Sequence, residues 1–240
     1  MTMSSMHILE QYASKYNSPE YFKTDPIIFP KHFVDLMKRG EACLQDVEVA
    51  AVIAAHLAWG RRDMIVRDCN RAFDEMGWEP YAYIIGGRYR CDDCSLHRTV
   101  KWSEFARICG NLKLFYEENE SLEILSQEQM RTRIYGQKSD PSAANKKINM
   151  LRRWMVRCDG IVDLGLWKSI SPAELIIPLD VHVHRVALEV GLTTRRQADL
   201  KTALEITEGL KKIFPGDPCL GDFALFAYGA ERAAGRAGTE

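Results

Sequence analysis

The sequence has 240 residues, of which 46% are hydrophobic and 27% are charged, and its formal net charge is −1. This length can bury a substantial core, as one large domain or two small ones. No apolar run approaches the roughly 18–20 residues that a membrane span needs, so we expect no membrane partner. The seven scattered cysteines indicate reduced thiols, and the N-terminus lacks the pattern of a signal peptide. We therefore expect a cytoplasmic protein.

The hydrophobic pattern predicts helices along most of the chain. Gln45–Trp59 is nearly continuously apolar, with Asp46 as the expected N-cap and Gly60 as the stop, which indicates a buried central helix. Amphipathic helices are expected at 61–78, at 103–119 with Ser103 as cap, at 142–158, 181–190 and 195–214, and at 217–229.

Few segments look extended, and Tyr81–Arg90 is the best candidate for an irregular or extended piece. The tail after residue 229 is expected to fray. The sequence thus predicts an all-α protein. We expect a single domain of two lobes, near 40–135 and 136–230, with the N-terminal segment packing on the second lobe.

The stretch "IIPLDVHVHRV" contains Asp180 followed by His182 and His184. On a strand these alternating side chains would share a face and could bind a metal ion. The apolar residues that follow recur at helical spacing, and on a helix residues two apart point in different directions. We therefore expect Asp180 to cap a helix that stops at Gly191. A capping carboxylate is held in its charged form, so it also suits a catalytic cleft.

A basic segment lies between Arg131 and Arg157, where eight Lys and Arg residues are opposed only by Asp140. Such a local excess is typical of a surface that contacts phosphates. A solvated helix surface would give the same pattern, and on charge alone the two interpretations are equally supported.

The segment "PLDVHVHRVALEVGL" resembles the aspartate segment of the helix-hairpin-helix DNA glycosylases, the superfamily of endonuclease III and 8-oxoguanine glycosylase. "NKKINMLRRWMVR" resembles their lysine-bearing helix, "DFALFAYG" their C-terminal helix, and "VAAVIAAHLAWGRRD" their early helix. Within the superfamily the chain is similar to DUF2400, a bacterial family of uncharacterised proteins near the archaeal 8-oxoguanine glycosylases.

Two departures limit the resemblance. The usual Leu-Pro-Gly-Val-Gly hairpin is replaced by "YGQKSDPSAAN", and the interval from Lys146 to Asp180 is longer than in members like endonuclease III. No four-cysteine cluster follows Asp180, so no iron–sulfur centre and no other cofactor is expected.

The resemblance implies a two-lobed helical fold with a cleft between the lobes, which binds double-stranded DNA as a monomer. It implies a glycosylase with AP lyase activity that removes a damaged purine, most plausibly 8-oxoguanine. Lys146 would attack C1′ of the flipped nucleotide, and Asp180 would offset the positive charge on the sugar. Lys147 is the alternate nucleophile, because periodicity leaves the choice open. The alternative function is a non-catalytic DNA-binding protein of the same fold.

The resemblance also suggests further contacts. Asp222 and Phe226 share a helix face and would read and stack on the base, although a cap and a core ring explain them equally well. Trp59 would wedge or stack, although an ordinary buried tryptophan explains it equally well, and His97 would reach into the cleft. The residues expected to contact DNA phosphates are Arg61, Arg62, Lys147 and Arg185, with pairing to an acid as the alternative for Arg185.

Cys91, Cys94 and His97 form only a weak zinc pattern, because a second half is missing. We expect a plain loop there and no metal site.

Overall fold

The structure is a computed structural model that describes residues 3–237, and the side chains of residues 6–229. The chain divides into two compact units. The central unit is Phe22–Asp140, and the terminal unit combines the segment up to Tyr21 with the chain from Pro141 onward. No helix in the described part of the chain is long and apolar enough to span a bilayer. The expectation of one cleft between two lobes stays a prediction.

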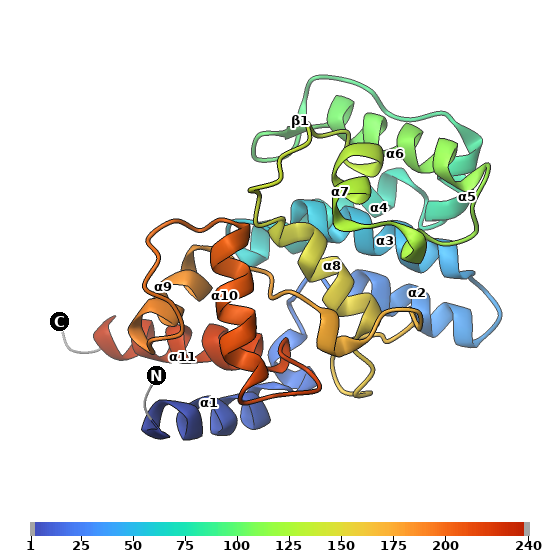
Figure 1. Ribbon diagram of the computed structural model, residues 1–240. Coiled ribbons are helices and arrows are strands. Elements are labelled where there is room, and N and C mark those ends of the chain that lie inside the picture. The colour runs from blue at the N-terminus through green and yellow to red at the C-terminus, as the bar shows by residue number, and fades with distance from the viewer. Residues whose placement is uncertain (1–2, 238–240) are drawn as a thin grey trace. The chain divides into compact units, whose positions relative to one another are not determined.

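The central unit is mostly helical (Figure 1). Its helices are α2 (Ile28–Lys38), α3 (Leu44–Leu57), α4 (Arg62–Glu75), α5 (Pro80–Gly86), α6 (Trp102–Tyr116) and the short α7 (Gln127–Gln129), which continues into a π-helical turn over Met130–Ile134. A 3-10 turn lies at Leu122–Ile124. Strands β1 (Ser95–His97) and β2 (Val100–Lys101) form a small antiparallel hairpin.

Helix α3 is the core of the central unit, as its apolar sequence predicted, and every residue from Val47 to Leu57 is buried. One of these is an acid, Glu48. Its carboxylate accepts hydrogen bonds from the Tyr116 hydroxyl, the Ser121 hydroxyl and the Leu122 backbone N–H. A buried charge is tolerated only with such partners, so Glu48 fixes the chain after α6 against α3.

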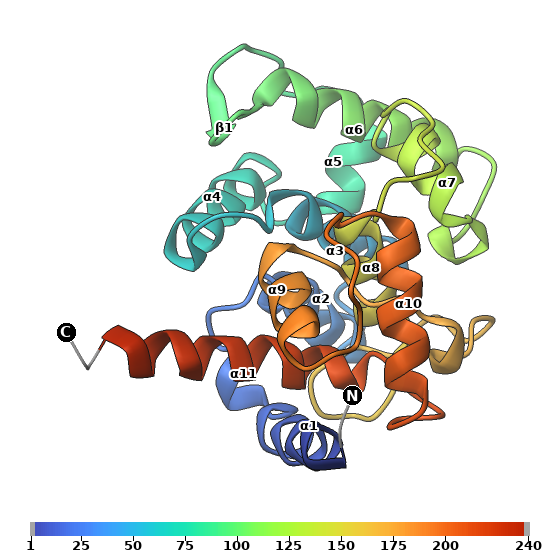
Figure 2. The ribbon, with the colours of Figure 1, turned by 60° about the vertical axis from the view of Figure 1, so that its left-hand side comes forward.

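The terminal unit contains α1 (Met3–Tyr16), α8 (Lys146–Val156), α9 (Val181–Glu189), α10 (Leu200–Lys211) and α11 (Leu220–Ala237), with 3-10 turns at Pro19–Phe22, across the boundary, and Pro172–Glu174. Helix α1 packs along α11, so the N-terminal segment belongs to this unit. Helix α9 also lies against α11 (Figure 2). The approach is closest at Gly229, where an added Cβ would lie 2.8 Å from Val186 Cγ2.

Several predicted helix starts were wrong. Cys43 is the N-cap of α3, and Asp46 instead accepts the Cys43 N–H from the third helical position. Lys101, and not Ser103, is the N-cap of α6. In α3 the N-cap residue and the third helical residue bond to each other, so the sequence does not show which of Cys43 and Asp46 begins the helix.

Three predicted segments also differ from the structure. The predicted helix at 142–158 begins only at Lys146, because Asn145 adopts a left-handed conformation with φ of 49°. Tyr81–Arg90 begins as helix α5 and only residues 87–90 are irregular, since Pro80 starts the helix and Gly87, with positive φ, ends it. Helix α11 runs to Ala237, beyond the predicted end at residue 229, and fraying of the tail stays a prediction; residues 238–240 lie outside the described part.

Candidate functional site

Asp180 is the N-cap of α9, as predicted. Its Oδ1 accepts the backbone N–H groups of His182 and Val183, both at 2.9 Å. The two histidines separate, since His182 is exposed while His184 is buried and lies 2.8 Å from the Arg195 carbonyl. The helical geometry therefore gives Asp180 a fixed position at the start of α9.

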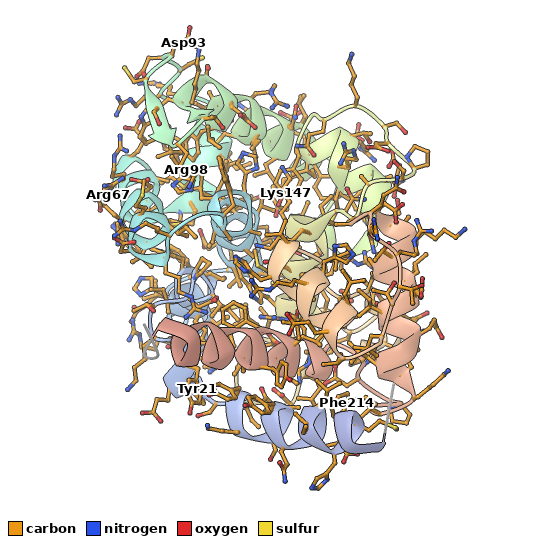
Figure 3. All side chains as sticks on the ribbon, turned by 90° about the vertical axis from the view of Figure 1, so that its left-hand side faces the viewer. Tyr21, Arg67, Asp93, Arg98, Lys147 and Phe214 are labelled. Carbon is orange, nitrogen blue, oxygen red and sulfur yellow. The ribbon has the colours of Figure 1, made fainter. Side chains whose placement is uncertain are left out.

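Lys146 and Lys147 are the first two residues of α8 (Figure 3 labels Lys147). Both are half-buried, and the left-handed residue Asn145 precedes them. On a helix of about 100° per residue, Lys146 shares a face with Asn149 and Arg153, while Lys147 lies about a quarter turn away. The two adjacent amines therefore face different surroundings.

Asp222 lies in the first turn of α11 and is buried. Its Oδ2 accepts a hydrogen bond from Arg153 Nη1 of α8 at 2.7 Å. Burial raises the pKa of the Asp222 carboxyl to about 6, and the Arg153 charge opposes this shift. The charge of Asp180 raises the pKa further and the charge of Lys146 lowers it.

These influences indicate that Lys146 and Asp180 each lie within electrostatic range of Asp222. Asp180 and Lys146 are 34 positions apart in the sequence, and Asp222 follows 42 positions later. The three residues lie at the start of α8, at the N-cap of α9 and in the first turn of α11. Their functional roles stay predictions.

A network of buried charges continues along α8. Arg153 and Arg157 are 6% and 1% exposed, and their guanidinium groups lie over the ring of Phe223. Arg157 Nη1 donates to Asp163 Oδ2 at 2.6 Å, and its Nε donates to Asp217 Oδ2 at 2.8 Å. Arg153 Nε also lies 3.4 Å from Asp163 Oδ1.

This network corrects the interpretation of the basic segment. Two of its eight cations, Arg153 and Arg157, are buried against aspartates and cannot contact phosphates. The segment also crosses the boundary between the two units at Asp140. Counting charges along the sequence overestimated the available positive surface, because the opposing aspartates lie before and within α11 and in the loop after α8.

Trp59, in the central unit, is 38% exposed. Its indole ring is covered on one side by the guanidinium of Arg98, whose Cζ lies 4.5 Å from the ring centroid. Gly60 makes this approach possible, because it has φ of +98° and an added Cβ would lie 2.6 Å from Arg98 Nη1. Arg98 lies in the turn between β1 and β2 (Figure 3). No sequence pattern predicted this role for Arg98.

A residue that contacts a substrate must be accessible, and His97 is not. Its side chain is fully buried, with Nδ1 2.8 Å from Asp68 Oδ2 and Nε2 2.9 Å from the Trp59 carbonyl oxygen. The prediction that His97 touches a base was therefore wrong, because both ring nitrogens are already engaged inside the central unit. His97 instead links the hairpin to the turn that carries Trp59.

Asp68 of α4 anchors this link. Burial opposes its ionisation, but hydrogen bonds from Arg67 and His97 outweigh burial and lower the pKa of its carboxyl. Arg71 adds contacts to Asp68 and to the Leu96 carbonyl. A charged Asp68 thus holds α4, the hairpin and the Trp59 turn together.

The remaining predicted DNA contacts lie at or near the surface, each beside an acid. Exposed Arg61 donates to both oxygens of Asp63, and Arg62 lies 3.9 Å from Asp25. Half-exposed Arg185 lies 4.0 Å from Glu189 on α9. The predicted base-stacking residue Phe226 is 43% exposed, one turn after Asp222. Contacts of these side chains with DNA stay predictions.

The cysteine pattern lies in an exposed loop, where Cys91 and Cys94 are free and accessible. Within the described residues, no group of three or more His, Cys, Asp and Glu side chains is arranged to hold a metal ion.

Comparison with known families assigns the chain to one of them. Residues 25–139 and 125–231 match the model of a family described as "Protein of unknown function (DUF2400)". Because these matches together cover most of the sequence, the chain belongs to this family, as its sequence suggested. No curated protein and no solved structure matches the chain.

Proposed function

We propose that this member of the family is a DNA glycosylase with AP lyase activity, which removes a damaged purine, 8-oxoguanine in the first instance, from double-stranded DNA. One observation carries the proposal: two backbone N–H groups hold the Asp180 carboxylate at the start of α9, and Asp180 and Lys146, the first residue of α8, both influence the buried carboxyl of Asp222. Schiff-base chemistry on a sugar requires an amine and a carboxylate, and we assign these two roles to Lys146 and Asp180. The resemblance of the surrounding segments to DNA glycosylases supplies the substrate class.

The chemistry follows from these groups. A base inside a duplex is inaccessible, so the damaged nucleotide is first flipped out. The neutral amine of Lys146 then forms a bond to C1′, and the glycosidic bond breaks as the base leaves with a proton. Opening of the sugar ring converts this adduct to a Schiff base. Loss of a C2′ proton then expels the 3′ phosphate. Asp180 stabilises the positive charge that develops on the sugar.

The geometry favours Lys146 over Lys147 as the nucleophile. Lys146 acts on the Asp222 carboxyl, and it shares a helix face with the partner of Asp222, Arg153. Lys147 lies on the face that carries the buried Leu151 and Trp154. We therefore assign the covalent step to Lys146 and a phosphate contact to Lys147.

A second candidate is a DNA-binding protein without catalysis. The exposed ring of Trp59 beneath the Arg98 guanidinium favours it, because aromatic rings and arginines bind unstacked bases without chemistry. A glycosylase would also use this surface to bind DNA, so only an assay of catalysis distinguishes the two functions.

Borohydride trapping provides the test. Duplexes that contain 8-oxoguanine or an abasic site are incubated with wild-type protein and reductant. We expect a covalent adduct that disappears in Lys146→Ala and persists in Lys147→Ala. Duplex binding that weakens with salt, without an adduct on either substrate, would support the second candidate instead. An adduct that survives replacement of both lysines would reject the assigned mechanism.

A further inference from the structure

Asn149 carries a buried hydrogen-bond acceptor that is not used. The residue is 1% exposed and lies on α8, three positions after Lys146. Its Nδ2 donates to the Ala144 carbonyl at 2.9 Å, which fixes the orientation of the amide, and its Oδ1 has no hydrogen-bond partner. Buried acceptors are nearly always paired, because an unpaired one has lost its hydrogen bonds to water without replacement, so its presence calls for an explanation.

The position of Asn149 connects it to the candidate site. Residues three apart on a helix share a face, and helical side chains lean toward the N-terminus. The bond from Nδ2 to Ala144, which precedes the helix, shows that Asn149 leans this way. Its free oxygen therefore lies at the end of α8 that carries Lys146. Farther along the same face, Arg153 binds Asp222.

We propose that Asn149 is a positioning residue for Lys146, an inference that rests on the proposed function. During the reaction Oδ1 accepts one N–H of the Lys146 amine. A neutral amine has two N–H bonds and one lone pair, so fixing an N–H bond also fixes the direction of the lone pair toward C1′. A neutral amide does this without the additional negative charge that would favour the unreactive ammonium form.

Two substitutions separate this role from a structural one. Asn149→Leu removes the acceptor and the donor, whereas Asn149→Asp removes the donor to Ala144 but keeps an acceptor and adds charge. We expect adduct formation to slow about 10-fold or more in Asn149→Leu, the scale of a lost positioning contact. In Asn149→Asp we expect adducts at high pH, with the pH profile displaced upward by about one unit. Asn111→Leu is the matched control, since Asn111 also donates to a backbone carbonyl, that of Ile134, and adduct formation should not change.

A second measurement is independent of activity. Lysine labelled with ¹³C at Cε is incorporated during expression, which leaves the amine unmodified, and the Lys146 signal, assigned with Lys146→Arg, is titrated by NMR in folded protein, with folding checked by circular dichroism. We expect the titration midpoint of Lys146 to be higher in Asn149→Asp than in wild type.

The outcomes are distinguishable. If wild type forms no adduct, the proposed function fails, while a displaced midpoint still supports the contact between Asn149 and Lys146. If wild type forms the adduct but Asn149→Leu reacts equally fast, the positioning role is overturned and the function stands. If adduct formation slows equally in both Asn149 variants and the titration midpoint of Lys146 does not change, Asn149 has a structural role only, which also overturns the proposal.

Discussion

Asp180 has a structural role and a proposed catalytic role, and one pair of substitutions tests both. Its carboxylate accepts two backbone N–H groups at the start of α9, and in the proposed mechanism it stabilises the sugar cation. Asparagine caps a helix about as well as aspartate but carries no charge, whereas alanine provides neither property. We therefore expect Asp180→Asn to keep its stability with much slower adduct formation, and Asp180→Ala to show the same slowing together with a loss of stability.

The magnitudes follow from these contacts. Losing the cap costs about 1 kcal/mol, which lowers the melting temperature of a protein of this size by about 2–4 °C. Asp180→Asn should change stability by only a few tenths of a kcal/mol. Loss of the carboxylate charge should slow adduct formation by about 10²-fold or more in both variants, the scale measured for single electrostatic groups in active sites.

Thermal melts and trapping rates on duplexes with 8-oxoguanine provide the assays. Asp199→Ala is the matched control, because Asp199 caps α10 through a 2.9 Å bond to the Thr202 N–H in the same unit. It should lose similar stability and retain full trapping. A wild-type trapping rate in Asp180→Asn would refute the reasoning, since the charge would then be unnecessary.

Three further outcomes are expected. Arg153→Met leaves Asp222 without its buried partner and Asp163 with Arg157 alone, so urea denaturation should show a free energy of unfolding about 3–5 kcal/mol lower; an unchanged midpoint would contradict the buried network. Because folding raises the pKa of Asp222 from 3.8 to about 6, the folded state binds its proton more tightly, and this stabilisation is lost as pH rises from about 4 through 6. In urea melts across this pH range, the free energy of unfolding should decline less in Asp222→Asn than in wild type. Equal declines in the two proteins would exclude Asp222 as the titrating group. Trp59→Ala should weaken binding of lesion duplex by about 5- to 100-fold in fluorescence anisotropy, with a small effect on stability because the ring is partly exposed; unchanged affinity would remove Trp59 from the DNA surface.

Local sequence patterns determined much of this fold. Uninterrupted apolar residues predicted the buried helix α3, and the proline, aspartate and apolar spacing around Asp180 predicted the start of α9 and its stop at Gly191. These features depend on contacts within a few residues, so periodicity and capping chemistry are sufficient to identify them. The same reasoning failed at Cys43, where Asp46 bonds back to the N-cap, and at Lys101, an N-cap without a side-chain capping bond.

Only the tertiary structure decided how the charged residues are used. In sequence Arg153 and Arg157 belong to a basic segment, but folding buries them against Asp163, Asp217 and Asp222. His97 looked accessible beside two cysteines, yet it is buried between Asp68 and the Trp59 carbonyl. Such pairings join residues up to 69 positions apart. Charge, exposure and pKa depend on these distant partners. For that reason the sequence determined the helices, while the side-chain contacts between α8 and α11 decided which charged groups remain available for chemistry.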